Sequence, residues 1–357
     1  MLELAAIVPA EIELVVLASK NASELYSHIS DQFRWSEISF KSQQCWRMFE
    51  LPRYVQRLGA SLVHVPIEAP VGKLSVPLIL TVHENPAKRS ALISSRTIGI
   101  KEWASRAFIK YLTPFAARRA ARVLAVSQTV AAEVRAAWRL PSTKVVTTYE
   151  AASERFFNAC VNPDVVPDAA DGYVLTFATG DPREDIEFVM AAYAAVRPRQ
   201  TLAVAGRYPD PGALRALAAR YDILGQFRYL GYVPEEVLPS LYATAAVFVQ
   251  MTCYEGFGLQ VVEAMAAGAP VVVSDLPVLR EIATDAALYV QLQDVEQLAM
   301  SLRSLLADSS LRANLSARAL TRARAFSWRR CAEQTLAVYR EVLDQQDAWT
   351  AYSHAGK

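Results

Sequence analysis

The stretch that decides the fold is YEGFGLQVVEAMAAGAPVVVSD, residues 254–275. A short apolar run, AVFVQ, ends just before it, and the apolar run VVVSD closes it. Glu255 and Glu263 are separated by seven residues around a turn made by Gly256 and Gly258. Glycine lets a backbone turn sharply and come close to a ligand. The pattern therefore predicts strand, loop, helix and strand, with a ligand at the loop.

The predicted helix runs from about Phe257 to Ala267 and begins at this loop. The free N–H groups of a helix N-terminus favour an anion, typically a phosphate. Glu263 lies about two turns inside the helix, too far from its start to cap it. Its carboxylate needs another partner, and the paired hydroxyls of a ribose would supply one. The alternative is that Glu263 pairs with a neighbouring cation and Glu255 is solvated.

Short β-branched runs alternate with helical patterns along most of the chain, which is typical of parallel sheets with crossover helices. In the first half, strands are predicted at Ile12–Ala18, Ser61–Val65, Pro77–His83, Arg122–Ser127 and Lys144–Thr148. In the second half they are predicted at Tyr173–Ala178, Thr201–Gly206, Phe227–Gly231, Ala246–Gln250, Val271–Asp275 and Ala287–Val290. Between the halves, the composition of NACVNPDVVPDAADG, residues 158–172, predicts a linker. Ligands of open α/β sheets bind at the carboxyl ends of the strands.

Composition narrows the class of protein. The 357 residues suggest two domains, and a hydrophobic content of 53% allows a large core. A formal charge of +1 argues against nucleic acid as a partner. The four scattered cysteines show neither a CxxC pair nor metal-ligand spacing, so we expect reduced thiols and a cytoplasmic protein. No apolar run approaches the roughly 18 residues of a membrane span.

Residues 254–275, together with YLGYVPEEVLPSLYATA before them and SDLPVLREIATDAALYV at their end, resemble the signature of the family 4 retaining glycosyltransferases. Weaker likeness runs from RAARVLAVS to YEAASERF, residues 119–156, and the resemblance covers most of the chain from about Pro77 onward. It implies an α/β GT-B fold, with two Rossmann-like domains facing a central cleft. We expect an N-terminal acceptor-side domain at 1–158, a nucleotide-sugar domain at 159–329, and a C-terminal helix, 330–357, that returns to the first domain.

The resemblance implies transfer of a hexose from a nucleotide-diphosphate sugar to a hydroxyl of a glycan or lipid-linked glycan, with retention, without a metal and without a cofactor. By match to the family motif, Glu263 would hold the ribose, and Glu255 would hold the sugar. His83, which ends the run PLILTVH, would reach the sugar near the reacting carbon. The other residues expected at the donor are Arg183, Arg207, Tyr232, Val233, Gly256, Phe257, Gly258 and Leu259.

The sequence departs from the family in the loop ATGDPREDIEF, residues 178–188. The family carries a cationic pair there that clamps the diphosphate. Thr179 stands at the usual arginine position and Glu184 at the usual lysine position. A carboxylate facing a diphosphate is repulsive, so we expect Glu184 to turn away or the chemistry to be altered. Arg183, with Arg207 as a possible substitute, is left to hold the phosphates.

Two further features depart from the family pattern. The start, MLELAAIVPAEIELVVLAS, resembles the end of the family's first helix followed by its second strand, without the usual first strand and glycine-rich loop. Residues 84–122 carry nine cations interleaved with Trp103, Phe108, Tyr111 and Phe115. The segment is either a solvated helical face or a docking surface for anionic membrane or a lipid-phosphate acceptor, at the inner face of the membrane.

Two other functions stay open. One is a catalytically silent GT-B partner protein, favoured by the absent cationic pair. The other is a GT-B enzyme with altered chemistry, such as a sugar epimerase. Glu255, Glu263 and His83 argue for an active transferase, because a silent protein has no physical reason to keep buried carboxylates.

Overall fold

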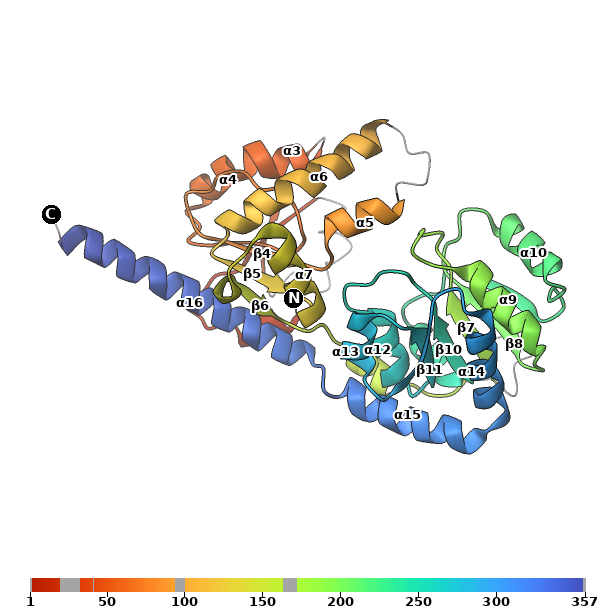
Figure 1. Ribbon diagram of the computed structural model, residues 1–357. Helices are drawn as coiled ribbons and strands as arrows, with labels where there is room; N and C mark the ends of the chain where they lie inside the picture. The colour runs from red at the N-terminus through yellow and green to blue at the C-terminus, as the bar shows by residue number, and fades with distance from the viewer. Residues whose placement is uncertain (1, 20–32, 41, 94–99, 163–171, 356–357) are drawn as a thin grey trace. The chain divides into compact units, whose positions relative to one another are not determined.

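A computed structural model describes residues 2–19, 33–40, 42–93, 100–162 and 172–355. The chain folds as two compact units (Figure 1). Unit 1 comprises Met1–Tyr149 and Trp328–Lys357, and unit 2 comprises Glu150–Ser327. The domain limits proposed from composition, at residues 158 and 329, remain predictions. Most of the predicted linker lies outside the described residues.

Unit 2 is built on one parallel sheet. Its described strands are ordered β12-β11-β10-β7-β8-β9. All six strands predicted in the second half are confirmed. β7, β8, β10 and β11 are almost wholly buried, whereas β9 and β12, at the two ends of the strand order, are only partly buried. Their bounds are β7 (Tyr173–Phe177), β8 (Thr201–Ala205), β9 (Phe227–Gly231), β10 (Val247–Gln250), β11 (Val271–Ser274) and β12 (Ala287–Val290).

Helices cover this sheet in two layers (Figure 1). In one, α9 (Ile186–Val196) packs against α10 (Pro211–Arg220) and α14 (Val295–Ala307). In the other, α12 (Leu259–Ala266) packs against α8 (Glu154–Phe157), α11 (Leu238–Thr244), α13 (Pro277–Ala283) and α15 (Ser309–Ala323). The strand order reverses between β7 and β10, which places a topological switch point at their carboxyl ends.

The described main sheet of unit 1 is also parallel and has the order β3-β4-β5-β6. Its strands are β3 (Val63–Val65), β4 (Leu78–Val82), β5 (Arg122–Ala125) and β6 (Val145–Thr147), each within a predicted run. Its helical segments are α1 (Leu2–Ile7), α3 (Gln43–Cys45), η2 (Trp46–Glu50), α4 (Leu51–Leu58), α5 (Pro86–Ile93), α6 (Ile100–Arg119), α7 (Gln128–Trp138), η3 (Ser142–Lys144) and α16 (Trp328–Ala355).

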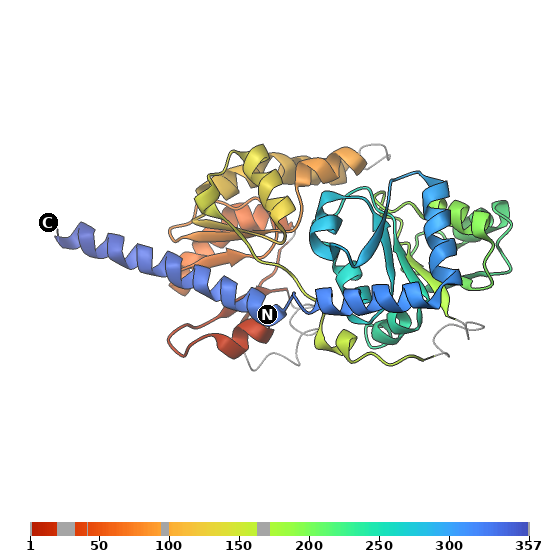
Figure 2. The same ribbon diagram turned by 60° about the horizontal axis from the view of Figure 1, so that its bottom comes forward.

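The C-terminal helix α16 belongs to unit 1, as expected. It contacts α1, and Figure 2 shows its blue start beside the red N-terminal helix. Leu4 of α1, Ile79 of β4 and Leu124 of β5 share one buried cluster with Leu336 and Val342 of α16. The last segment of the chain is therefore part of the core formed by the first.

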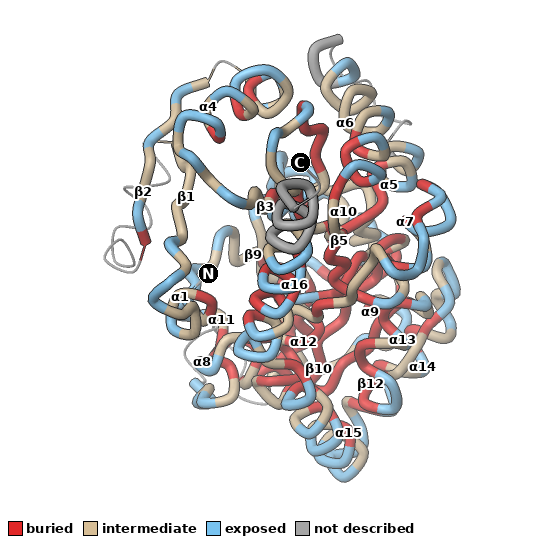
Figure 3. The backbone as a smooth tube through the Cα atoms, turned by 90° about the vertical axis from the view of Figure 1, so that its left-hand side faces the viewer, coloured by how far each residue is buried: buried red, intermediate tan, exposed pale blue. Residues whose placement is uncertain are grey.

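The strand predicted at residues 12–18 is confirmed, but it lies outside the main sheet. β1 (Val15–Ala18) pairs with β2 (Arg34–Glu37), which the sequence analysis missed, in a separate parallel sheet. Figure 3 shows both strands in tan and pale blue, whereas β5 and β10 are red. Ile12 and Leu14 pack against the cluster around α16, and this packing buries the apolar residues of the segment without a place in the main sheet.

Candidate functional site

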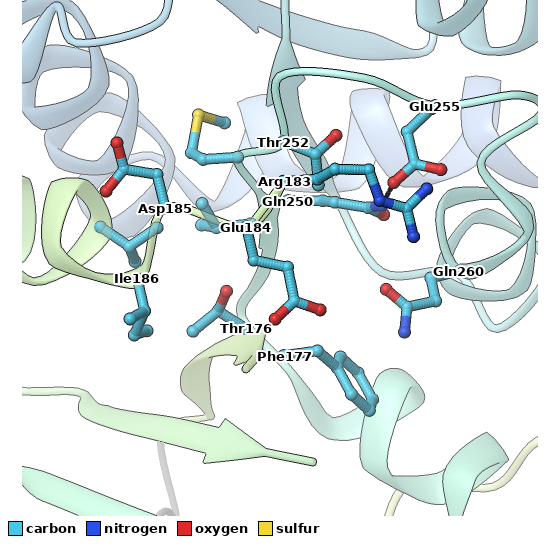
Figure 4. Close-up of a pocket in the computed structure, with 13 residues that line it drawn as sticks. Thr176, Phe177, Arg183, Glu184, Asp185, Ile186, Gln250, Thr252, Glu255 and Gln260 are labelled. Carbon is cyan, nitrogen blue, oxygen red and sulfur yellow. Dashed lines mark hydrogen bonds between the residues drawn. The ribbon is translucent and has the colours of Figure 1, made fainter. Parts of the chain in front are cut away.

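A pocket lies at the switch point of unit 2 (Figure 4). Its volume is about 40 Å³. It is lined from two segments only, one that follows β7 and one that follows β10, with the ends of both strands as its floor. The lining residues are Thr176, Phe177, Arg183, Glu184, Asp185, Ile186, Val189, Val249, Gln250, Met251, Thr252, Glu255 and Gln260. Arg183 and Glu255, both expected at the donor, are thus brought together.

The loop after β7 is closed by its own side chains. Glu184 accepts hydrogen bonds from the Thr179 N–H at 2.6 Å and from the Thr179 hydroxyl at 2.9 Å. The two positions where the family has cations therefore bond to each other. Glu184 lines the pocket while its two carboxylate oxygens accept from Thr179. Burial raises the pKa of Glu184 above its usual value, and the two bonds from Thr179 oppose that rise.

Arg183 is paired within the same loop. Its Nε donates to Asp181 Oδ1 at 3.0 Å and its Nη2 to Asp181 Oδ2 at 2.9 Å. The two side chains are mostly buried, with exposed fractions of 20% and 19%. Such a two-point pair fixes the plane of the guanidinium and offsets its charge. A phosphate would therefore share Arg183 with Asp181, a competitor that the sequence analysis did not consider.

The segment after β10 keeps the expected geometry. Gly258 caps α12 with a φ of +91°, a conformation that other residues adopt only with strain. A Cβ added there would meet Leu279 Cδ2 at 2.8 Å, so the Leu279 side chain would have to shift. Glu255 accepts a hydrogen bond from Gln250 Nε2 at 3.0 Å, which fixes its carboxylate beside the pocket. The Phe257 side chain is buried against Phe326 and offers a ligand only its backbone.

Glu263 lies in a different environment from Glu255 and is not among the described residues that line the pocket. It is half-buried on α12, where the Tyr242 hydroxyl donates to its Oε2 at 3.4 Å. Burial raises the pKa of Glu263 to about 7, opposed by the charge of Arg155 and the bond from Tyr242. Arg155 is itself paired with Glu235 at 3.0 Å. The sequence analysis left open that Glu263 pairs with a neighbouring cation instead of a ligand. In the structure Arg155 acts on Glu263 only through its charge.

Three other expected donor residues lie on the loops after β8 and β9, outside the described pocket lining. The Arg207 guanidinium stacks over the Tyr232 ring, 4.2 Å from its centroid. Tyr232 is 58% exposed and Val233 is half-buried, so the ring offers an open face at the strand ends. Arg207 therefore packs on one face of the Tyr232 ring.

His83 follows β4 in unit 1. Its Nε2 is 3.0 Å from the carbonyl oxygen of Pro66, and its backbone N–H donates to Glu68 Oε2 at 2.9 Å. Burial raises the pKa of Glu68. The ring is thus oriented by the loop that follows β3, as a positioned functional histidine requires.

Gln250, Thr252 and Asp181 were missed by the sequence analysis. The signal available for Gln250 was a glutamine at the end of an otherwise apolar strand, VFVQ. Among the residues that the structure describes, no group of three or more His, Cys, Asp and Glu is placed to hold a metal ion.

Comparison with known proteins identifies the family. A model described as "Glycosyltransferase Family 4" matches residues 3–151, and one described as "Glycosyl transferases group 1" matches residues 163–322. The chain belongs to the family 4 glycosyltransferases. It is 36% identical over 229 residues to O-antigen chain mannosyltransferase B of Escherichia coli, covering 61% of this chain and 60% of that protein. The chain thus spans less than two thirds of that relative.

Solved structures of other proteins share the fold of this chain. Sucrose-phosphate synthase from Thermosynechococcus elongatus has a TM-score of 0.69 at 21% identity, covering 88% of this chain and 85% of that one. HepE of Anabaena, in complex with UDP and glucose, has a TM-score of 0.69 at 13% identity, covering 92% of this chain and 100% of that one. These likenesses show the GT-B architecture of two Rossmann-like units.

Proposed function

We propose that the protein is a retaining hexosyltransferase that uses a nucleotide-diphosphate sugar. The observation that carries this proposal is the pocket at the switch point, where Glu255 and the glycine-capped start of α12 meet. In the reaction, the bond between the anomeric carbon and the phosphate oxygen breaks. The acceptor oxygen bonds to the same face of that carbon, and nucleoside diphosphate and a proton are released.

Each part of the site has a proposed role. The N–H groups at the start of α12 stabilise the negative charge of the leaving diphosphate, with Arg183 beside them. Glu255 binds hydroxyls of the transferred sugar. Glu263, in its ionised form, accepts hydrogen bonds from the ribose, and Tyr232 lies along the base. For His83 the proposed role is the one that the family resemblance implies, contact with the transferred sugar.

The relative from Escherichia coli is named an O-antigen chain mannosyltransferase, and this name supports mannose as the transferred sugar. The acceptor is then a glycan or lipid-linked glycan in polysaccharide or glycolipid synthesis. A thermal-shift screen with GDP-mannose and with UDP-, dTDP- and ADP-hexoses tests the proposal, because a ligand that binds only the folded state raises its melting temperature. We expect GDP-mannose to give the largest shift. If no nucleotide sugar shifts the transition, a silent GT-B partner replaces the enzyme.

We also propose that α6 docks on anionic lipid at the cytoplasmic face of a membrane. Trp103, Tyr111 and Phe115 are 62%, 63% and 55% exposed and recur at helical spacing. Lys110 lies over the Tyr111 ring and Arg118 over the Phe115 ring, so cations border the aromatic face. No described helix is long and apolar enough to cross a membrane. Of the other predicted cations, Arg96 lies outside the described residues.

Co-sedimentation with phosphatidylglycerol vesicles tests this surface. Binding should fall steeply as salt rises, because the Debye length shrinks from about 30 Å at 0.01 M to about 8 Å at 0.15 M. Replacing Tyr111 and Phe115 by serine should weaken binding, whereas Leu224→Ser, at a site 51% exposed in unit 2, should not. Absence of binding at low salt would leave a solvated helical face.

A further inference from the structure

Two polar side chains at the end of β10 have buried atoms without a partner. Gln250 and Thr252 are only 7% and 4% exposed, and both line the pocket. Gln250 Oε1 and Thr252 Oγ1 make no hydrogen bond to any described residue. Buried polar atoms in native proteins are nearly always bonded, so each exception needs an explanation. Figure 4 shows both side chains at the site where Arg183 and Glu255 converge.

The orientation of the Gln250 amide follows from its partner. Its nitrogen donates to Glu255, and an ionised carboxylate can only accept. The NH₂ group therefore faces Glu255 and the carbonyl oxygen faces away from it. The Thr252 backbone is also fixed, because its N–H donates to Ser274 Oγ at 2.8 Å. The Gln250 oxygen is thus oriented by a bond of its own side chain, and the Thr252 hydroxyl is carried by an anchored backbone.

The chemistry of the pocket selects hydroxyl groups over phosphate. Gln250 Oε1 can only accept, and Thr252 Oγ1 can accept or donate. The carboxylates of Glu184 and Glu255 add further acceptors, while the Arg183 charge is shared with Asp181. Phosphate oxygens are acceptors and would meet acceptors here. A sugar hydroxyl supplies the missing donor and can accept from Thr252 in return.

The size of the pocket limits how much of a sugar enters it. A water needs at least about 10–15 Å³ of such volume. A volume of about 40 Å³ therefore admits a hydroxyl or hydroxymethyl group and excludes a whole hexose ring. The ring itself must remain outside, at the level of Glu255.

We propose that Gln250 and Thr252 form a specificity subsite that binds one hydroxyl or hydroxymethyl group of the transferred hexose. This inference rests on the proposed function and adds residues that read the sugar. Through its amide nitrogen, Gln250 also orients Glu255, so recognition of that group and placement of the Glu255 carboxylate are linked. The diphosphate stays at the start of α12, outside the subsite.

The test uses Thr252→Val and Gln250→Leu with GDP-mannose and its 2-, 3-, 4- and 6-deoxy analogues. We expect each variant to lose about 10- to 100-fold in kcat/KM with GDP-mannose. One deoxy analogue should be about as poor for the wild type, and with that analogue Thr252→Val should cause no further loss. Thr201→Val is the matched control, because Thr201 is a buried threonine at the start of β8. This variant should leave kcat/KM with GDP-mannose and with each deoxy analogue unchanged.

Stability gives an independent readout. Thr252→Val replaces an unpartnered buried hydroxyl by a methyl group of similar size, so its melting temperature should equal or exceed that of the wild type. A lower melting temperature of Thr252→Val overturns the subsite. The subsite is also overturned if every deoxy analogue lowers kcat/KM by the same factor in the wild type and in the variant. If neither GDP-mannose nor any other nucleotide hexose binds the wild type, the proposed function fails instead.

Discussion

The two segments that line the pocket differ in how they use their polar groups. The loop after β7 bonds to itself: Thr179 donates to Glu184, and Arg183 pairs with Asp181. The segment after β10 instead presents the glycine-capped start of α12, together with Gln250, to the pocket. In the family pattern, both segments would hold the diphosphate. We propose that in this chain the helix binds the anion, while the loop after β7 forms a wall rich in acceptors.

Among variants of the two segments, Arg183→Ala should have the largest effect on kcat/KM. If Arg183 still shares the diphosphate with α12, its loss should lower kcat/KM by about 100-fold or more, because a two-point charged contact is lost. Steady-state kinetics with the donor identified by thermal shift measure this. Asp181→Asn is the matched variant, and it should bind the donor as well or better, since it releases the guanidinium. Full activity in Arg183→Ala would assign the diphosphate to α12 alone.

Glu255→Ala comes next and tests the helix side. Loss of a charged hydrogen bond to the reacting sugar should lower kcat by roughly 10- to 100-fold with little change in donor affinity. Single-turnover kinetics and calorimetry separate the two quantities. A variant that loses affinity while keeping kcat would move Glu255 away from the reacting carbon.

Glu263 should affect donor affinity and not turnover. Its pKa of about 7 in the folded protein lies above its usual 4.5, so donor affinity should increase as pH rises through 7 and the carboxylate ionises. Burial of the charged form also costs stability, up to about 3 kcal/mol between pH 4.5 and 7. Glu263→Gln should therefore weaken donor binding about tenfold at pH 8. Its free energy of unfolding should also lack the decrease between pH 4.5 and 7 that ionisation of Glu263 causes. Denaturant titrations at pH 4.5, 6 and 8 check the second effect, and parallel curves for the two proteins would contradict it.

Glu184→Lys has the smallest expected effect. It restores the cation of the family pattern but breaks the bonds from Thr179 that close the loop. We expect donor affinity to stay the same or rise a few-fold, and melting temperature to fall slightly. Glu184→Gln, which keeps the shape, separates the charge from the loop closure. A large loss of activity in Glu184→Lys would mean that the acceptor-rich wall itself is needed for the reaction.

The sequence by itself determined the architecture of unit 2 and the two glutamates of its motif. Runs such as VVVSD can be buried only in a covered parallel sheet, and a glycine turn before an alanine-rich helix has few other structures open to it. Local pattern was sufficient where a strand is a continuous apolar run, as in β11. For residues 12–18 the same reasoning predicted the strand but not its partner, since pairing with β2 and packing against α16 join residues far apart in the chain.

Only the tertiary structure decided what the polar side chains do. The sequence predicted that Glu184 would repel phosphate. It did not predict the hydrogen bonds by which Thr179 holds Glu184. It predicted Arg183 as a phosphate ligand but did not predict that Asp181 binds the same guanidinium. From the sequence, Gln250 is one more strand residue; the fold set its nitrogen on Glu255 and left its oxygen buried without a partner among the described residues. Hydrogen bonds depend on direction and distance, and neither is fixed until strands far apart in the sequence lie side by side.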